Sequence, residues 1–252
     1  RRVRSLARRL SLAPRAGVFV EREVAGLPDP ARRYLLGAIA PGAPLTRAAR
    51  LTMRGEIRLG ARWLGYRAEE VLAPECGFVW SARVARVITG SDHVLDGEGG
   101  LDWRLLGLVP VVRASDPDVA RSSAGRAGAE AVWLPTALLP SAGVRWRALD
   151  DHRASVGVRV GGVELDVTLT LGPDGRLRSV RFMRWGDPDA TGTFGPHPFG
   201  MDVLAHGRFG PFTIPVAGRA GWFHGTERFA EGEFFRFHVT GMRLCERAGE
   251  QS

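Results

Sequence analysis

The sequence contains no lysine and no asparagine, and arginine supplies all of its strongly basic side chains. Such a bias is typical of GC-rich coding sequences, so the calculated pI of 11.0 says little about function. Residues 1–22 hold seven arginines and one glutamate, which leaves the rest of the chain nearly balanced within a formal net charge of +8. A nucleic-acid-binding fold carries its positive patch on the folded body. We therefore expect no nucleic-acid partner.

Cysteine is also scarce, and the standard catalytic motifs are missing. Cys76 and Cys245 are too few for a disulfide framework, and neither has a histidine or cysteine at metal-ligand spacing. The sequence leaves open whether they pair with each other. We find no nucleophile elbow, zinc-protease helix or phosphate-binding glycine loop. The sequence therefore predicts no metal, no cofactor and no catalytic residue, and it favours a binding protein over an enzyme.

Long apolar runs are absent as well. No stretch approaches the roughly 20 residues that a transmembrane helix needs. The basic segment 1–26 is expected to form a tail or a short helix. The alternative is that this segment flanks a membrane tether upstream of Arg1, with arginine on the cytoplasmic side. That alternative predicts a membrane-associated domain, and without it the expected location is the cytoplasm.

The commonest pattern in the sequence is a two-residue alternation of apolar and polar side chains, which is typical of half-buried strands. It is clearest at 163–171, where valine and leucine alternate with acidic residues and threonine. This run ends at a Pro-Asp-Gly turn that predicts a hairpin with 177–185. Further strand-like runs lie at 51–59, 64–68, 78–84, 144–148, 202–209, 212–223 and 232–244.

Two helices interrupt the strands. The first is expected between Pro28 and Pro41, and the second from Asp116 to about Leu134. The centre of the second helix, Ser122–Gly128, is small and contains glycine, so we expect that part to be loose. The segment 187–199 is rich in glycine and proline and is expected to be a loop.

These elements define the predicted fold class. Short strands joined by turns, without a βαβ rhythm, predict antiparallel pairing. A sheet of ten or so strands with one apolar face curls, because strands twist and open edges are a liability. We therefore predict a mainly β (α+β) protein with a single half-barrel domain over residues 27–248. One curved antiparallel sheet carries an N-terminal helix and a middle helix, and the stretch Asp116–Leu139 is expected to lie across its open side.

Glu130 is the most notable ionisable residue, because it lies in the largely apolar stretch Ala129–Leu134. A carboxylate near an apolar interior requires a partner. Four roles are open to Glu130: it can bind the polar head of a ligand, act as an acid, face solvent, or pair with an arginine on the sheet rim.

The seven tryptophans are numerous for this length, and most lie in strand-like runs. Aromatic side chains on one face of a curved sheet either fill the core or line a ligand cavity. The candidate lining residues are Trp80, Trp103, Trp133 and Trp146.

Asp92 and His93 are adjacent on a predicted strand, and a carboxylate beside an imidazole can orient a general base. Adjacent strand residues point to opposite faces of a sheet, so we expect only a structural role for this pair. The Asp-Pro-Asp sequences at 116–118 and 187–189 are typical of helix starts and turns.

The stretch AEAVWLPTALLPSAGVRW, Ala129–Trp146, resembles an uncharacterised bacterial family of unknown function that is frequent in actinobacteria. Further similar pieces are LPDPARRYL at Leu27–Leu35, PECGFVWSARV at Pro74–Val84 and LLGLVPVV at Leu105–Val112. Members of the family carry bulky residues where this chain has SSAGRAG, which predicts weaker packing of the middle helix. The resemblance implies no activity. The order of helices and strands in this family is similar to that of the half-barrel in periplasmic lipoprotein-carrier proteins.

Taken together, the sequence predicts a non-enzymatic domain that binds a lipid or another hydrophobic ligand on the concave face of its sheet. Glu130 and the four candidate tryptophans are the expected ligand-binding residues. The alternatives are an enzyme that uses Glu130 as acid or base, and an interaction domain tethered to a membrane. An enzyme requires several polar groups in one cleft, whereas a carrier requires an apolar trough with few.

Overall fold

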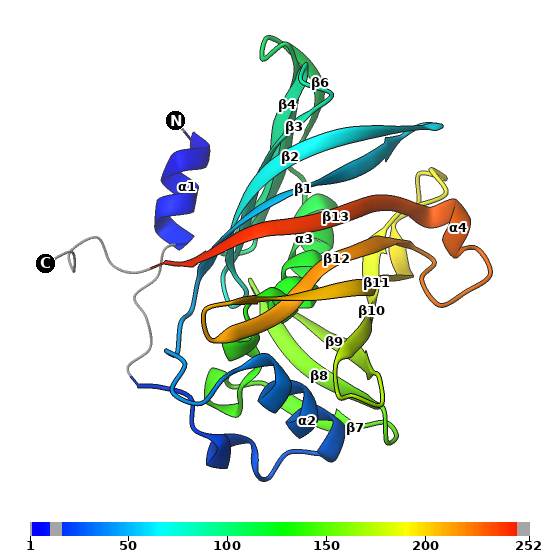
Figure 1. Cartoon of the computed structure of the whole chain (residues 1–252). Helices are drawn as coiled ribbons and strands as arrows, with labels where there is room; N and C mark the ends of the chain where they lie inside the picture. The colour runs from blue at the N-terminus through cyan, green and yellow to red at the C-terminus, as the bar shows by residue number, and fades with distance from the viewer. Residues whose placement is uncertain (1, 11–16, 246–252) are drawn as a thin grey trace, which may run out of the picture.

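The structure is a computed structural model that describes residues 2–10 and 17–245, and it contains one long antiparallel sheet that curls around a helix (Figure 1). Thirteen strands pair in the order β6-β5-β4-β3-β2-β1-β13-β12-β11-β10-β9-β8-β7. Their bounds are β1 Ala49–Leu59, β2 Arg62–Ala73, β3 Gly77–Val84, β4 Ile88–Leu95, β5 Glu98–Leu105, β6 Val109–Ala114, β7 Arg145–Ala148, β8 Arg153–Val160, β9 Val163–Leu171, β10 Leu177–Gly186, β11 Gly195–Phe209, β12 Phe212–Trp222 and β13 Glu233–Leu244.

The chain builds this sheet in two halves. The first six strands run outward from β1 to the edge strand β6, and the next seven run inward from the edge strand β7 to β13. The two halves meet where β1 pairs with β13 at the centre. Among the described residues the two edge strands do not pair with each other, so the sheet stays open. The predicted mainly β fold, with a single curved antiparallel sheet, is confirmed.

The helices of the described residues lie in three places: before β1, between β6 and β7, and between β12 and β13. Their bounds are α1 Arg2–Leu10, α2 Asp29–Ala38, α3 Pro117–Ala129 and α4 Phe229–Gly232, with short 3-10 helices η1 Glu21–Val24, η2 Glu130–Trp133, η3 Pro135–Leu138 and η4 Pro140–Ala142. Helix α3 begins the crossing from one edge of the sheet to the other, and it contacts strands of both halves. Figure 1 shows α3 inside the curl of the sheet and α2 near β7.

The expectation that Ser122–Gly128 is loose is wrong. Helix α3 runs without a break through this segment, and most of its small residues are buried. A Cβ atom on Gly125 would lie 3.2 Å from Phe182 Cε2, and one on Gly128 would lie 2.9 Å from Val158 Cγ2. The helix therefore approaches the sheet more closely than larger side chains would permit, and the small residues favour packing instead of weakening it.

Several strands differ from the prediction made from the sequence. The strand predicted around Asp92 and His93 is β4. Strands β5, β6 and β8 were not predicted from the sequence, and β11 begins at Gly195 inside the expected loop 187–199. In that segment Gly195 pairs with Gly186, and Pro196 and Pro198 lie opposite Trp185 and Met183 of β10. These glycine and proline residues take part in the pairing of β10 with β11. Their usual preference for loops does not predict this pairing.

The apolar interior lies on the concave side, between the sheet and α3. Its fully buried large side chains include Trp80, Phe78, Leu51 and Phe212. A second, smaller cluster lies where α1 contacts β2, β3 and β4, and it contains the fully buried Leu10. Cys76 and Cys245 pack against this cluster, and no disulfide joins the two residues. No helix in residues 2–10 and 17–245 has the length and apolar character to cross a membrane.

Candidate functional site

A cavity of about 130 Å³ lies on the concave side of the sheet, beside α3. Its walls are mainly aromatic and aliphatic, and four charged side chains share one part of the lining. The apolar lining residues are Ile57, Trp80, Ala129, Trp133, Val180, Phe182, Phe199, Met201, Ala220, Phe234, Phe235 and Phe237, and the charged ones are Asp92, Arg126, Glu130 and Arg184.

Arg126 is the centre of the charged groups. It lies on α3, one turn before Glu130, and its Nε donates to Glu130 Oε1 at 2.7 Å. Its Nη1 lies 3.4 Å from Asp92 Oδ2, and its Nη2 lies 3.7 Å from Glu70 Oε1. The guanidinium also lies over the ring of Phe78, 4.4 Å from its centroid. Burial alone would lower the pKa of Arg126, but the three carboxylates raise the pKa above its usual value.

Glu70 is the most deeply buried member of this group. Its side chain is 0% exposed, and neither carboxylate oxygen accepts a hydrogen bond from a donor in the described residues. Burial raises the pKa of Glu70 well above the usual value, the charge of Glu130 raises it further, and Arg126 opposes both. Burial in the apolar interior therefore favours the uncharged form of Glu70, in which Asp92 and Glu130 balance Arg126 and Arg184.

Asp92 extends the charged groups to the neighbouring strands. Asp92 lies opposite Trp80 in the β3–β4 ladder and faces inward with it, whereas His93 faces outward. Trp103 Nε1 donates to Asp92 Oδ1 at 2.7 Å. Burial raises the pKa of Asp92, and the charge of Arg126 and the bond from Trp103 oppose this shift. The Asp92–His93 pair therefore does not act as a unit, as expected, but Asp92 itself belongs to the cavity.

Arg184 is the second cation in the lining. Its Nε lies 3.1 Å from Ser122 Oγ and 3.3 Å from the Ser122 carbonyl oxygen. The guanidinium lies 4.5 Å from the centroid of Phe199, but no carboxylate lies within ion-pair distance of it among the described residues. Burial lowers the pKa of Arg184 to about 10, and the like charge of Arg126 acts in the same direction. Arg184 remains protonated at neutral pH and is available to an acceptor on a ligand.

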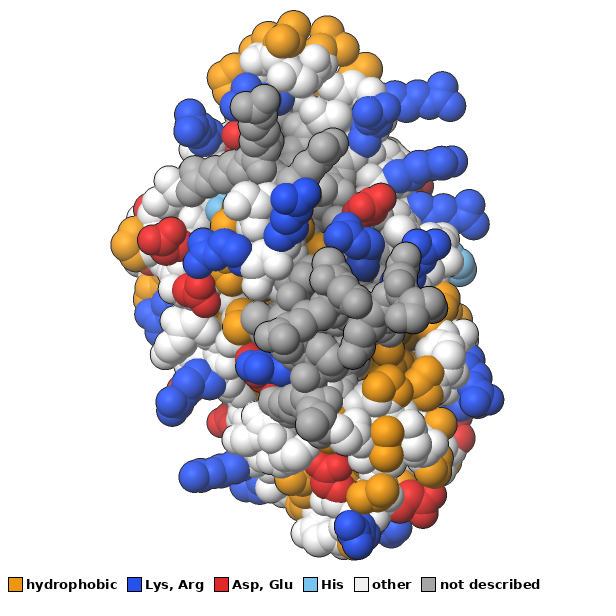
Figure 2. All heavy atoms as spheres, turned by 90° about the vertical axis from the view of Figure 1, so that its left-hand side faces the viewer, with side chains coloured by type: hydrophobic (Ala, Val, Ile, Leu, Met, Phe, Trp, Pro, Cys, Tyr) orange, Lys and Arg blue, Asp and Glu red, His pale blue; other side chains and the backbone are white. Residues whose placement is uncertain are grey.

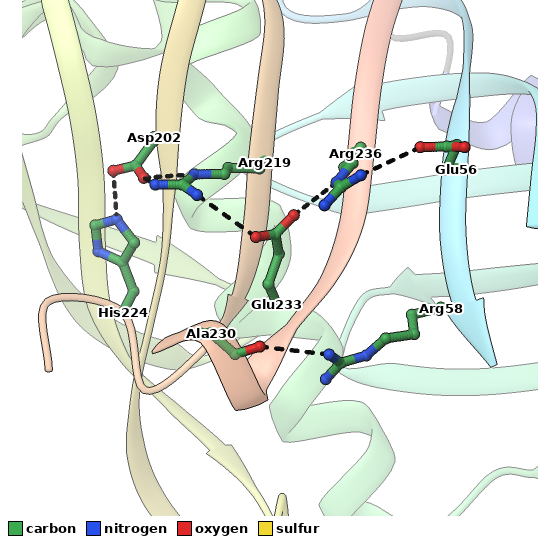
Figure 3. A network of polar contacts seen from close by, with 8 residues as sticks. All are labelled: Glu56, Arg58, Asp202, Arg219, His224, Ala230, Glu233 and Arg236. Atoms are coloured by element: carbon green, nitrogen blue, oxygen red, sulfur yellow. Dashed lines mark hydrogen bonds and ion pairs between the residues drawn. The ribbon is translucent and has the colours of Figure 1, made fainter. Parts of the chain in front are cut away.

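A different charged network lies on the convex face of the same sheet (Figure 3). Asp202 on β11 contacts Arg219 on β12 and His224, and Glu233 bridges Arg219 to Arg236 on β13. Asp202, Arg219 and Arg236 alternate along their strands with the lining residues Met201, Ala220 and Phe237, so they point away from the cavity. Glu233 joins them because the β12–β13 ladder shifts register between Ala220 and Gly221. The network links adjacent strands, and we assign it a structural role.

The structure brings together three of the five residues that the sequence analysis selected. Glu130, Trp80 and Trp133 line the cavity. Trp103 lies behind Asp92 and packs against Trp80, with ring centroids 5.7 Å apart. Trp146 is not part of the lining, because it packs against Tyr34 of α2 and donates to the Leu138 carbonyl oxygen.

Sequence reasoning missed Glu70, Arg126 and Arg184. A usable signal exists for all three, and two of them sit at an inward position of an alternating strand. Glu70 follows Tyr66 and Ala68 at two-residue spacing, and Arg184 follows Val180 and Phe182 in the same way. A charged side chain on the apolar face of a strand requires a partner in the interior. For Arg126 the signal is its i,i+4 spacing from Glu130 on a helix.

The Family of unknown function (DUF6544) matches residues 17–234. No curated protein matches the sequence. A LolA superfamily protein from Nitrosomonas europaea is 9% identical, with a TM-score of 0.41 over 85% of this chain and 91% of that chain.

Two further solved structures show a similar degree of likeness. A candidate outer membrane lipoprotein-sorting protein domain from Vibrio parahaemolyticus is 8% identical, with a TM-score of 0.40 over 80% of this chain and 86% of that chain. A DUF1329 family protein from Desulfovibrio piger is 12% identical, with a TM-score of 0.36 over 81% and 87%. The resemblance that the sequence motifs indicated agrees with these matches. At these identities and TM-scores, the solved structures do not indicate a function.

Proposed function

Since the chain belongs to the Family of unknown function (DUF6544), which brings no activity with it, we propose a function from the cavity itself. The domain binds a hydrophobic or lipid-like molecule that has a polar end, and it performs no catalysis. The observation that carries this proposal is an aromatic-lined cavity of about 130 Å³ whose wall includes Glu130 and Arg184. Apolar cavities with a few convergent polar groups are the usual form of small-molecule sites.

The volume limits which part of a ligand enters. An apolar cavity of about 150 Å³ in a protein core accommodates one benzene molecule. The cavity of about 130 Å³ therefore admits one ring or a short segment of an acyl chain. A longer chain must displace side chains or extend out of the cavity, so binding of a whole lipid requires movement of the lining.

The charged groups determine how the polar end is recognised. Glu130 Oε2 is buried and accepts no hydrogen bond from the described residues, so a ligand hydroxyl can donate to it. The Arg184 guanidinium can donate to an oxygen of the same group. A carboxylate on the ligand can accept from Arg184 but cannot donate to Glu130, and it meets the negative charges of Asp92 and Glu130, whereas a hydroxyl can donate to Glu130 and accept from Arg184. We therefore favour an uncharged, hydroxyl-bearing polar end.

Native mass spectrometry of the purified protein, followed by organic extraction, tests this function. The probes are dodecanol and dodecanoic acid, which share a chain and differ in the charge of the polar end. We expect a complex with dodecanol and a weaker one with dodecanoic acid. Ala220→Leu, which fills the cavity, is expected to abolish both complexes. Ala217→Leu lies on the opposite face of the same strand and serves as the matched control.

Two results would contradict this function. The first is a clean mass with no uptake of either probe. The second is uptake that survives Ala220→Leu and is lost in Ala217→Leu, because the probe would then occupy the convex face. A stronger complex with dodecanoic acid would keep the cavity as the site but overturn the preference for an uncharged end.

A second candidate function is acid–base catalysis by Glu130. It is favoured by one observation, the convergence of Asp92, Arg126, Glu130 and Arg184 in the lining of one cavity. A molecule recovered by extraction can be incubated with the wild-type protein and with Glu130→Gln. A change in the mass of that molecule with the wild type alone would establish catalysis, and an unchanged mass in both would exclude Glu130 as the catalytic group for it.

A further inference from the structure

The β5–β6 hairpin ends in a cluster of exposed apolar side chains. Leu106 is 68% exposed and Leu108 is 78% exposed, and the hairpin continues with exposed Val109, Val111 and Val112. Figure 2 shows hydrophobic side chains gathered at one end of the molecule, the end at which Figure 1 places β6. Clusters of this kind are rare on monomeric proteins in water and mark interaction sites.

The neighbouring β3–β4 turn lies against this tip and enlarges it. The backbone N–H of Leu106 donates to the Val87 carbonyl oxygen at 2.6 Å, and Val87 is itself 40% exposed. The tip therefore consists of two adjacent turns with apolar side chains on both. We call residues 85–87 together with 105–112 the hairpin tip.

The charged residues of the two turns and of the adjoining strand ends are all arginines. Residues 83–89 and 103–113 contain four arginines, Arg83, Arg86, Arg104 and Arg113, and no aspartate or glutamate. Arg104 pairs with Asp102. The other three have no ion pair with a carboxylate in the described part of the chain. Unpaired arginines beside a protruding apolar tip are complementary to a surface that is apolar inside and anionic outside.

The free edge of this hairpin is poorly suited to pairing with another strand. β6 is the edge strand of the sheet, and Pro110 within it has no N–H to donate. The β5–β6 ladder also shifts register between Trp103 and Arg104. Proline and bulges at an edge protect it from pairing with a second chain. These features favour a lipid surface as the partner of the hairpin, and they disfavour pairing of β6 with a strand of a second protein chain.

We propose that the hairpin tip inserts shallowly into the surface of a bilayer that contains anionic lipids. Leu106 and Leu108 enter the boundary between headgroups and acyl chains, while Arg83, Arg86 and Arg113 contact lipid phosphates. The proposal does not depend on ligand binding in the cavity. The hairpin tip and the cavity share no residue, so either function can fail without the other.

Flotation of the protein with vesicles tests this inference. The probes are vesicles of phosphatidylcholine alone and vesicles of phosphatidylcholine mixed with phosphatidylglycerol. We expect the wild-type protein to float with the anionic vesicles and to be released by added salt. The double substitution Leu106→Ser with Leu108→Ser is expected to weaken binding by about tenfold or more. Arg83→Gln with Arg86→Gln is expected to weaken binding by roughly fivefold for each arginine removed.

A matched control is provided by Leu204 on β11, which is 69% exposed and lies outside the hairpin tip. Leu204→Ser should leave flotation unchanged. The proposal is overturned if the wild-type protein does not bind anionic vesicles, or if Leu204→Ser weakens binding as much as the leucine pair. It is also overturned if light scattering shows a dimer that the leucine pair converts to a monomer without any effect on vesicles. That result would assign the hairpin tip to contact between copies of this chain.

Discussion

Glu70 Oε1 and Arg126 Nη2 lie 3.7 Å apart in an interior where the Glu70 side chain has no access to solvent. The distance is too long for a strong hydrogen bond, and the nearer partner of Arg126 is Glu130, at 2.7 Å. One guanidinium thus faces three carboxyl groups in a nearly enclosed space. Burial favours the uncharged form of Glu70, which removes this imbalance, and this leads to the first prediction.

Stability should fall as the pH rises from the mildly acidic range, because of Glu70. Its pKa in the folded state is raised by burial, so the folded protein holds a proton that the unfolded chain releases near pH 4.5. Above that pH the unfolded state binds fewer protons, and the free energy of unfolding decreases until the folded-state pKa is passed. One such proton contributes a slope of up to about 1.4 kcal/mol per pH unit. The raised pKa of Asp92 acts in the same direction.

Urea unfolding at a series of pH values measures this slope. Glu70→Gln keeps the shape of the neutral carboxyl group and should flatten the slope, leaving only the part due to Asp92. The neighbouring Glu69 is 65% exposed and pairs with Arg50, so Glu69→Gln should leave the slope unchanged. A slope that is equal in wild type and Glu70→Gln would mean that Glu70 is ionised in the folded state.

Replacing Arg126 should be among the most damaging single changes in α3. Arg126→Met removes the cation that balances Glu130 and Asp92, and breaking a buried ion pair costs about 3–5 kcal/mol. Arg121→Met on the same helix removes an exposed arginine stacked on Trp185 and should cost about 1 kcal/mol or less. Chemical denaturation of both variants at neutral pH gives the comparison, and equal losses would argue against a central role for Arg126.

Opposite effects are expected from the same substitution at two helical glycines. Gly128→Ala in α3 places a Cβ 2.9 Å from Val158 Cγ2, and the overpacking should outweigh the gain in helix propensity by about 1 kcal/mol. Gly37→Ala in α2 meets no atom within 4 Å and should stabilise the protein by about 0.5–1 kcal/mol. Thermal unfolding of the two variants checks the signs. A gain at both positions would show that α3 can move away from the sheet.

The Glu233 carboxylate should contribute to the free energy of unfolding, because two arginines lie beside it. Arg219 and Arg236 are directly opposite each other across β12 and β13, and like charges in such pairs are destabilising. Glu233 contacts both and is 9% exposed (Figure 3). Glu233→Gln should lower the free energy of unfolding by about 1–3 kcal/mol.

The control for that variant is Glu231→Gln, because Glu231 is 67% exposed and pairs with a single arginine. Its expected effect is within about 0.5 kcal/mol. Added salt should reduce the loss in Glu233→Gln by screening the two arginines. A loss that is insensitive to salt would indicate a packing defect as its cause.

The sheet could be predicted from the sequence because one of its faces is apolar and the other is wet. Alternation of the kind seen at 163–171 reports this directly, and β9 was found with its bounds. Strands β5 and β6 escaped detection because the second half of this hairpin is apolar on both faces and exposed. Periodicity reports burial on one side, so a strand with no buried side gives no alternation to detect.

The candidate site was only partly predictable. Glu130 could be selected because its neighbours in sequence are apolar, which is a local signal. Glu130 lies near Glu70 and Asp92 only because the fold brings their strands next to the helix that precedes Glu130. No local sequence pattern indicates such a contact. The middle helix was misjudged for the opposite reason. Glycine weakens an isolated helix, but in α3 it allows the helix to approach the sheet.

The pairing of β1 with β13 has a consequence for how the chain is made. During synthesis β1 emerges from the ribosome first among the thirteen strands and β13 emerges last, so this ladder can form only when the whole sheet is present. Until then β1 is an unprotected edge, open to pairing with other nascent chains. The first six strands can form their meander early, but the inward face they present stays uncovered. A chaperone that holds this face during translation would bear directly on the yield of folded protein.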